Sequence, residues 1–189
     1  VKRYADHSGF KIQYNIIGYG RDVEKVKTSI RNSEHFTANF IGEMNVNSLN
    51  DYLIKNVDLL MSMGTAALEG GKLKIPTILL DASYEEIPND YKFKWLFNSD
   101  GSNVAQFIHS KSFENNGQSI DKIIESVRAN QESLGEQCLS YVDQNHSITS
   151  VSKKLLAGVK KASSTWGDIN PQLLKKNIIR VIYDHYRYK

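Results

Sequence analysis

Residues 57–80 read VDLLMSMGTAALEGGKLKIPTILL, and this stretch decides the fold class. Residues 57–63 form a nearly continuous apolar run, which is typical of a strand buried on both faces of a parallel sheet. A Gly-Thr pair at 64–65 interrupts the run and opens a predicted helix over 66–72, and a second buried strand is predicted over 76–80. A strand, a helix and a strand at this spacing indicate a right-handed βαβ unit in a parallel sheet.

The segment before this unit repeats the alternation of strand and helix. Residues 11–17 predict a strand that ends at a Gly-Tyr-Gly turn, and residues 22–33 predict a helix with apolar residues at helical spacing. A second strand is predicted over 36–41. A short helix follows, for which Asn47 or Ser48 is the expected N-cap.

The C-terminal half of the chain is mostly helical in this interpretation. Residues 82–118 hold many aromatic side chains without a clean period, so we expect a long structured connection rather than a flexible linker. Ser119 is the predicted N-cap of an amphipathic helix whose apolar face is set by residues 120–127. Further helices are predicted over 148–162 and from Asn170 onward. The whole pattern predicts an α/β fold, a Rossmann-like doubly wound parallel sheet with additional C-terminal helices.

The composition narrows the classes of function. The chain has 189 residues, a formal net charge of +3 and a single cysteine, Cys138. One cysteine excludes an internal disulfide framework, so we expect a reducing, cytoplasmic compartment. The five histidines show no metal-ligand spacing, and we expect no metal site. A nearly balanced charge argues against nucleic acid as a partner.

The end of the strand over 57–63 is the candidate binding site. A helix N-terminus has free backbone N–H groups and a positive dipole end, so it can hold a phosphate. Gly64 lets the backbone approach a ligand closely, and the Thr65 hydroxyl can cap the helix or bind a phosphate oxygen. The Glu69 carboxylate can accept hydrogen bonds from the vicinal hydroxyls of a ribose.

The same stretch resembles the donor-binding signature of the GT-B-fold, retaining-type glycosyltransferases of group 1. Those families have a buried strand, a turn and a helix that carries a glutamate, followed seven residues later by a proline that opens the next strand. Glu69 and Pro76 have this spacing. Upstream, the Gly-Tyr-Gly turn at 18–20 resembles the Gly-x-Gly turn of the family, and Gly42-Glu43 resembles its turn near the nucleotide base.

This resemblance implies the donor-binding domain of an enzyme that transfers a sugar from a nucleoside diphosphate sugar, UDP- or GDP-linked, to an acceptor hydroxyl in polysaccharide or glycan biosynthesis. It implies no cofactor and no metal, and it identifies no catalytic residue. The implied donor contacts share a position at the carboxyl ends of the predicted strands. They are Gly64 and Thr65 at the diphosphate, Glu69 at the ribose, Gly42 and Glu43 near the base, and Gly18 and Gly20 at the border of the cleft.

The chain also departs from the family pattern. Met61 stands where many of these families have a second glutamate, eight residues before Glu69. The Arg and Lys pair of the family normally follows a first strand, which is expected to be missing because the sequence opens in what looks like the middle of a helix. We therefore expect a nucleotide-sugar-binding domain over 1–145 without its first strand, and helices over 146–189 that pack on it or on a missing N-terminal acceptor domain. The fragment alone is expected to be inactive.

Two other functions stay open. The first is a sugar-nucleotide epimerase of the same two-domain architecture. The second is a non-catalytic nucleotide-binding or interaction module, in which Gly64 and Thr65 form a plain strand-to-helix turn and Glu69 is an exposed helical residue. The last helix places basic residues beside an apolar stripe from Leu173 to Ile182, so it is a candidate for peripheral contact with the inner face of a membrane.

Overall fold

The computed structural model describes residues 1–100, 103–163 and 166–168. These residues fall into two units, Val1–Ser147 and a second unit that begins at Ile148. The predicted helix from Asn170 onward, with its basic and apolar stripes, lies outside the described residues.

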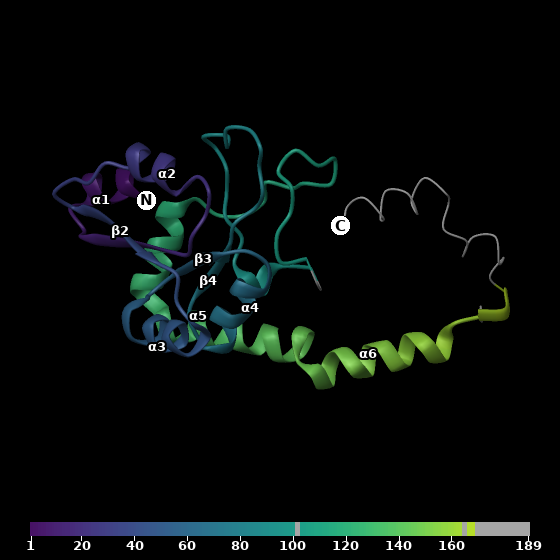
Figure 1. The fold of residues 1–189 in the computed structure, drawn as a ribbon. Coiled ribbons are helices and arrows are strands. Elements are labelled where there is room, and N and C mark those ends of the chain that lie inside the picture. Colours follow the sequence, from purple (N-terminus) through teal and green to yellow (C-terminus); the bar gives the residue numbers. More distant parts are fainter. Residues whose placement is uncertain (101–102, 164–165, 169–189) are drawn as a thin grey trace, which may run out of the picture. The chain divides into compact units, whose positions relative to one another are not determined.

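The first unit alternates helices and strands in the order that the sequence predicted (Figure 1). Its elements are α1 (Lys2–Ser8), β1 (Ile12–Ile17), α2 (Val23–Ser29), β2 (Phe36–Gly42), α3 (Val46–Asn56), β3 (Leu60–Ser62), α4 (Gly64–Lys72), β4 (Thr77–Leu79), the 3-10 turn η1 (Leu96–Asn98) and α5 (Ile120–His146). The second unit contains α6 (Ile148–Lys161) and the 3-10 turn η2 (Trp166–Asp168).

The strands form two small parallel sheets. In one sheet β1 pairs with β2, so that Ile12 lies opposite Phe36. In the other, β3 pairs with β4, so that Leu60 lies opposite Thr77. The mixed α/β class and the parallel pairing of neighbouring strands are confirmed. A single doubly wound sheet is not confirmed, because among the described residues no strand lies between β1 and β3 to join the two pairs.

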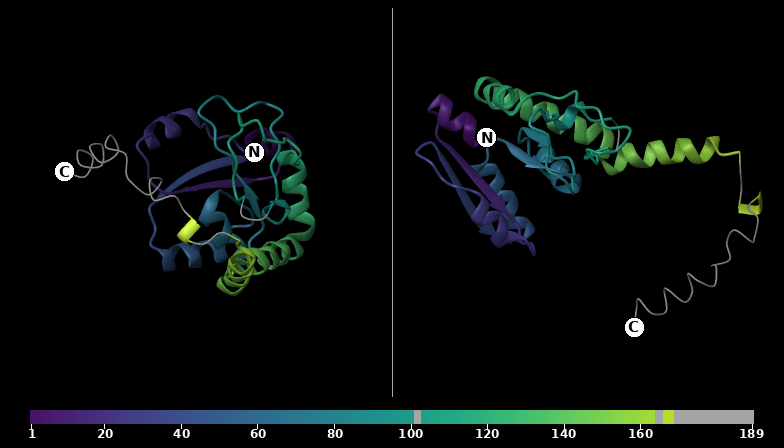
Figure 2. Two further views of the ribbon diagram at one scale, coloured as in Figure 1. Left: turned by 90° about the vertical axis from the view of Figure 1, so that its right-hand side faces the viewer. Right: turned by 90° about the horizontal axis from the view of Figure 1, so that it is seen from above.

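Helices cover both sides of these strands. In Figure 1 and in the left view of Figure 2, α2 and α3 lie on opposite sides of the β1–β2 pair. The long helix α5 runs behind β3 and β4 and contacts α4 and η1. Its predicted N-cap is confirmed, since the Ser119 side chain accepts a hydrogen bond from the Lys122 backbone N–H. The N-cap of α3 is Asn45, not Asn47 or Ser48, and its side chain accepts from the Ser48 N–H at 3.0 Å.

The core of the first unit lies between β4, α4 and α5. Every residue of β4 is buried, and Ile78 has no exposed surface. The aromatic connection after β4 folds back onto this strand. Trp95 forms a bridge with Ile78 and is 3% exposed, while the Leu79 N–H donates to the Lys94 carbonyl at 2.9 Å. The connection is therefore structured, as the density of aromatic residues predicted.

Three glycines allow α4 to pack closely against its neighbours. A Cβ on Gly70 would lie 2.3 Å from the Leu60 side chain, and a Cβ on Gly71 would lie 2.7 Å from the Leu96 side chain. On α5, a Cβ on Gly135 would lie only 2.1 Å from the Lys74 carbonyl oxygen. The last contact is with backbone, which cannot rotate away as a side chain can. Gly135 therefore sets the distance between α5 and the C-terminal end of α4.

We expect Gly135→Ala to lower the free energy of unfolding by about 3 kcal/mol, at the upper end of the overpacking range. Gly158→Ala is the matched control, because Gly158 is also helical and a Cβ there would meet no atom within 4 Å. That control should leave stability unchanged or raise it slightly. Urea unfolding followed by circular dichroism measures both, and equal effects of the two substitutions would contradict the packing argument.

The only cysteine, Cys138, is part of this core and has no exposed surface. Burial raises the pKa of its thiol to about 11, from an ordinary value near 9. The unfolded chain therefore loses this proton at lower pH than the folded chain, and the folded state loses stability as pH rises from about 9 to 11. Below pH 9 both states keep the proton and the effect vanishes.

We expect the free energy of unfolding to fall by about 2 kcal/mol between pH 9 and 11 because of this thiol. Cys138→Ala removes the titrating group, so this variant should be less stable at pH 8 but should lack that part of the decline. Parallel urea titrations at several pH values measure the difference. Identical pH profiles for the two proteins would show that Cys138 does not titrate abnormally.

Candidate functional site

A glycine with positive φ follows or ends each of the first three strands. The values are 125° at Gly18, 83° at Gly42 and 60° at Gly64. This backbone conformation is strained for residues with a side chain, which explains glycine at the strand ends. A Cβ on any of the three would meet no atom within 4 Å, so the space beside them is open. All three belong to the predicted donor contacts.

The start of α4 leaves backbone donors available. Met63 is the N-cap residue and makes no side-chain cap bond. Thr65 is the second residue of the helix, and its hydroxyl makes no cap bond either, so its expected capping role is not found. Thr65 and Ala66 are exposed, and no hydrogen bond from the described residues reaches their N–H groups. These two amides and the helix dipole are suited to an anion.

Thr65 and Glu69 are four residues apart on α4, so they lie one turn apart on the same side of the helix. Both are exposed. An anion at the first turn and a hydroxyl-bearing group near Glu69 can therefore be held together by one face of a single helix.

The remaining predicted contacts form a second group, at the ends of β1 and β2. The Gly18 N–H donates to the Gly42 carbonyl at 2.8 Å, which brings these two turns together. Gly20 accepts from the Val23 N–H at the start of α2, and Glu43 is exposed. The turns after β1 and β2 belong to one sheet, whereas α4 follows β3 of the other sheet. Within the described part of the chain, no hydrogen bond joins these turns to α4.

The long connection crosses the α4 start. The Gly64 N–H donates to the Val104 carbonyl at 3.1 Å, so the first amide of the helix is already used. The Asp81 carboxylate holds the connection in place: it accepts from the Gln106 N–H at 2.7 Å and from the Tyr91 hydroxyl at 2.9 Å. Asp81 directly follows the strand predicted over 76–80, but the sequence did not predict its two partners. They are 10 and 25 residues away, and no local spacing indicates them.

Two buried polar atoms near this crossing have no hydrogen-bond partner among the described residues. They are the Ser62 hydroxyl oxygen and the Gln106 side-chain oxygen. Ser62 ends β3, and Gln106 is held against Asp81. Buried polar atoms are normally paired. These two oxygens, one at the end of β3 and one in the connection, are therefore exceptions to that pattern among the described residues.

Ser83 and His109 lie close together but do not form an activated nucleophile. The Ser83 hydroxyl donates to the Glu85 carbonyl at 2.8 Å. The His109 Nε2 lies 3.1 Å from the Ser83 hydroxyl oxygen. Because the serine proton is already engaged by a carbonyl, the histidine is placed to donate to Ser83 rather than to take its proton. Glu85 lies 3.8 Å from the same Nε2, not from the other ring nitrogen that a triad requires. The cluster therefore lacks the arrangement of a Ser–His–acid triad.

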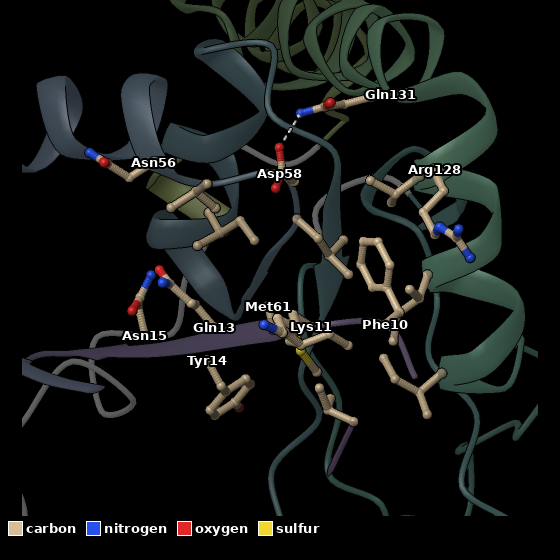
Figure 3. Close-up of a pocket in the computed structure, with 18 of the residues that line it drawn as sticks. Phe10, Lys11, Gln13, Tyr14, Asn15, Asn56, Asp58, Met61, Arg128 and Gln131 are labelled. Carbon is tan, nitrogen blue, oxygen red and sulfur yellow. Dashed lines mark hydrogen bonds between the residues drawn. The ribbon is translucent and has the colours of Figure 1, made fainter. Parts of the chain in front are cut away.

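A cavity of about 570 Å³ lies away from the predicted contacts (Figure 3). Its walls come from β1 and the residues before it, from the segment 57–61, and from α5. Figure 3 shows Gln131 of α5 bonded to Asp58, at 3.1 Å, across one side of the cavity. None of the seven predicted donor contacts lines it.

The described residues contain no cluster of three or more metal-ligating side chains, and no described helix has the length and apolar character of a membrane span. Comparisons with protein-family models, with curated proteins and with solved structures find no match.

We expect Asp81→Asn to loosen the connection over the α4 start. Burial and the hydrogen bond to the Asp81 carboxylate raise the pKa of Tyr91. A neutral amide should let the Tyr91 pKa fall toward its ordinary value, visible in the NMR shift of its ring carbon bonded to oxygen. Loss of about 1 kcal/mol should speed amide exchange at Gln106 about fivefold. Asp90→Asn is the control, because Asp90 is exposed and should change neither signal.

Proposed function

We propose that this chain is the donor-binding domain of a glycosyltransferase, with a Rossmann-like arrangement of its strands. The observation that supports this best is the start of α4. Gly64 turns the chain with a φ of 60°, Thr65 and Ala66 are exposed residues whose N–H groups have no hydrogen-bond partner among the described residues, and Glu69 lies one turn further on the same side. A nucleoside diphosphate presents phosphates and ribose hydroxyls in the same order.

The chemistry at this helix suits the diphosphate leaving group. Two backbone N–H groups and the positive end of the dipole stabilise negative charge without a metal ion. The Glu69 carboxylate accepts hydrogen bonds from ribose hydroxyls, because an ionised carboxylate is an acceptor only. Gly42 and Glu43 contact the base in this proposal, and Gly18 and Gly20 border the cleft.

The chain supplies only part of the reaction in this proposal. It holds a UDP- or GDP-linked sugar, while a separate acceptor domain supplies the acceptor hydroxyl and the remaining catalytic groups. Transfer of the sugar forms a bond from the acceptor oxygen to the sugar and releases the nucleoside diphosphate. We place the enzyme in the cytoplasm, in polysaccharide or glycan biosynthesis.

A second candidate function is a non-catalytic nucleotide-binding or interaction module. The Val104 carbonyl at the Gly64 N–H favours it, because an acceptor oxygen stands where a phosphate oxygen would otherwise bind. Glu69 is also exposed, as expected of an ordinary helical residue. The two functions differ in whether a ligand reaches the α4 amides.

Titration with UDP, GDP, ADP and CMP, followed by amide NMR shifts, tests the proposal. We expect saturable shifts at Thr65 and Ala66 for one diphosphate. Glu69→Ala should weaken its binding about tenfold, because hydrogen bonds to a charged group are lost. Glu132→Ala is the matched control, since Glu132 is an exposed helical glutamate on α5.

Two outcomes would contradict the donor site. One is the absence of saturable shifts at α4 with all four nucleotides at millimolar concentration. The other is equal weakening by the substitutions at Glu69 and Glu132. Saturable shifts confined to α4 that Glu69→Ala leaves unchanged would favour the non-catalytic module.

A further inference from the structure

Helix α6 is amphipathic, and its apolar face is exposed (Figure 1). The large apolar residues of the helix follow one another at spacings of three and four, which places them on one side. They are Ile148, Val151, Leu155 and Val159, with Leu156 at the border. Their exposed fractions range from 46% to 86%, and α6 contains no buried residue. At 3.6 residues per turn this face covers an arc of about 140°.

Helix α5 shows how an apolar face of similar spacing looks when it is packed. Its residues Ile123, Ile124, Val127 and Leu134 are all buried. An exposed apolar face is therefore not a general property of the long helices of this chain. Contiguous exposed apolar surface of this kind marks a site of contact with a protein or a membrane.

The charged residues of α6 are all lysines, and they border the apolar face on both sides. Lys153 and Lys160 lie two turns apart along one border, and Lys154 and Lys161 lie two turns apart along the other. A lysine at such a border can cover apolar surface with its stem while its ammonium group stays in a polar layer. The sequence holds no aspartate or glutamate from 148 to 167.

The charge of the whole chain is divided in the same way. Residues 1–147 contain 15 lysines and arginines and 19 aspartates and glutamates, a net charge of −4. Residues 148–189 contain 9 and 2 of these, a net charge of +7. The formal net charge of +3 hides this asymmetry. A basic segment next to an acidic one indicates an anionic partner for the basic segment.

We propose that α6 binds the surface of a bilayer that contains anionic phospholipids. The helix lies in the plane of the interface, its apolar face enters the boundary between headgroups and acyl chains, and its lysines contact lipid phosphates. Its 14 residues span about 21 Å, which is too short to cross a bilayer. The inference rests on α6 and does not depend on the proposed donor site.

The lysines argue against a second copy of α6 as the occupant. Two α6 helices paired through their apolar faces would bring lysines of both chains together, without a carboxylate among them. Paired helices normally place opposite charges along such borders. The segment from Leu173 to Ile182 is also basic, with Lys175, Lys176 and Arg180, so the same repulsion disfavours it as a cover.

Nucleic acid would match the charge of α6 but not its apolar face. Lysine contacts with phosphates supply non-specific affinity for nucleic acid. They would leave Val151, Leu155 and Val159 in water. An anionic bilayer offers phosphate groups and, about 5–10 Å deeper, acyl chains. It therefore accounts for both sides of the helix.

The test measures flotation of the full chain with vesicles. One set is phosphatidylcholine alone, and the other is phosphatidylcholine mixed with the anionic phosphatidylglycerol. We expect binding to the mixed vesicles, weakened by added salt because the lysine–phosphate attraction is screened. Binding to the mixed vesicles should exceed binding to phosphatidylcholine alone at least about tenfold.

Two pairs of variants separate the apolar face from the charge. Val159→Ser should weaken binding to the mixed vesicles about tenfold, because apolar burial is lost. Its matched control is Val46→Ser, since Val46 is an equally exposed valine on α3. Lys160→Gln should weaken binding about fivefold. Its matched control is Lys55→Gln, because Lys55 is an exposed lysine in the last turn of α3.

A dye that reports polarity shows which side of α6 enters the bilayer. Cys138 has no exposed surface, so a thiol-reactive dye labels an introduced cysteine selectively. Val159→Cys places the dye on the apolar face, and Ala157→Cys places it about 160° away on the polar face. We expect a blue shift on the mixed vesicles at position 159 and none at 157.

Four outcomes would overturn the proposal. The chain fails to float with mixed vesicles, or Val159→Ser and Val46→Ser weaken binding equally, which leaves charge alone, as for a nucleic-acid site. Ile178→Ser abolishes binding that Val159→Ser leaves intact, which assigns the membrane contact to the segment 173–182. Without lipid, the chain is a dimer that Val159→Ser dissociates, which assigns the face to a second copy. Circular dichroism of each variant confirms that it is folded.

Discussion

The close approach of α4 to α5 and β4 is the constraint on which the candidate site depends. A side chain at Gly135 would collide with the Lys74 carbonyl, and side chains at Gly70 and Gly71 would collide with Leu60 and Leu96. Because these contacts fix the C-terminal end of α4, they also fix the direction of its axis. The amides without a hydrogen-bond partner at the other end of the helix then point in a defined direction, which a preorganised anion-binding site requires.

Much of this unit could be predicted from the sequence. The apolar run over 57–63 and the β-rich run over 11–17 are strong signals for strands, and both strands are present. The N-cap at Ser119 could be predicted because a serine stands directly before a segment whose apolar residues have helical spacing. The cap at Asn45 was missed because Asn45, Asn47 and Ser48 are all good capping residues, and only the backbone conformation distinguishes them.

Other features depend on contacts between distant residues and had no local signal. Asp81 binds Tyr91 and Gln106 because the aromatic connection folds back over β4, and that path is decided by burial of Trp95 against Ile78. The prediction of one continuous sheet assumed that neighbouring strand pairs share an edge. Pairing of β1 with β2 and of β3 with β4 satisfies each local pattern equally well without that shared edge, so the sequence pattern could not distinguish one sheet from two.

The division into two sheets bears on how the chain would bind a nucleotide. The proposed phosphate and ribose contacts lie on α4, while the proposed base contacts, Gly42 and Glu43, lie at the end of β2. A ligand that touches both groups must itself hold the two sheets in register, and this ordering reduces its affinity.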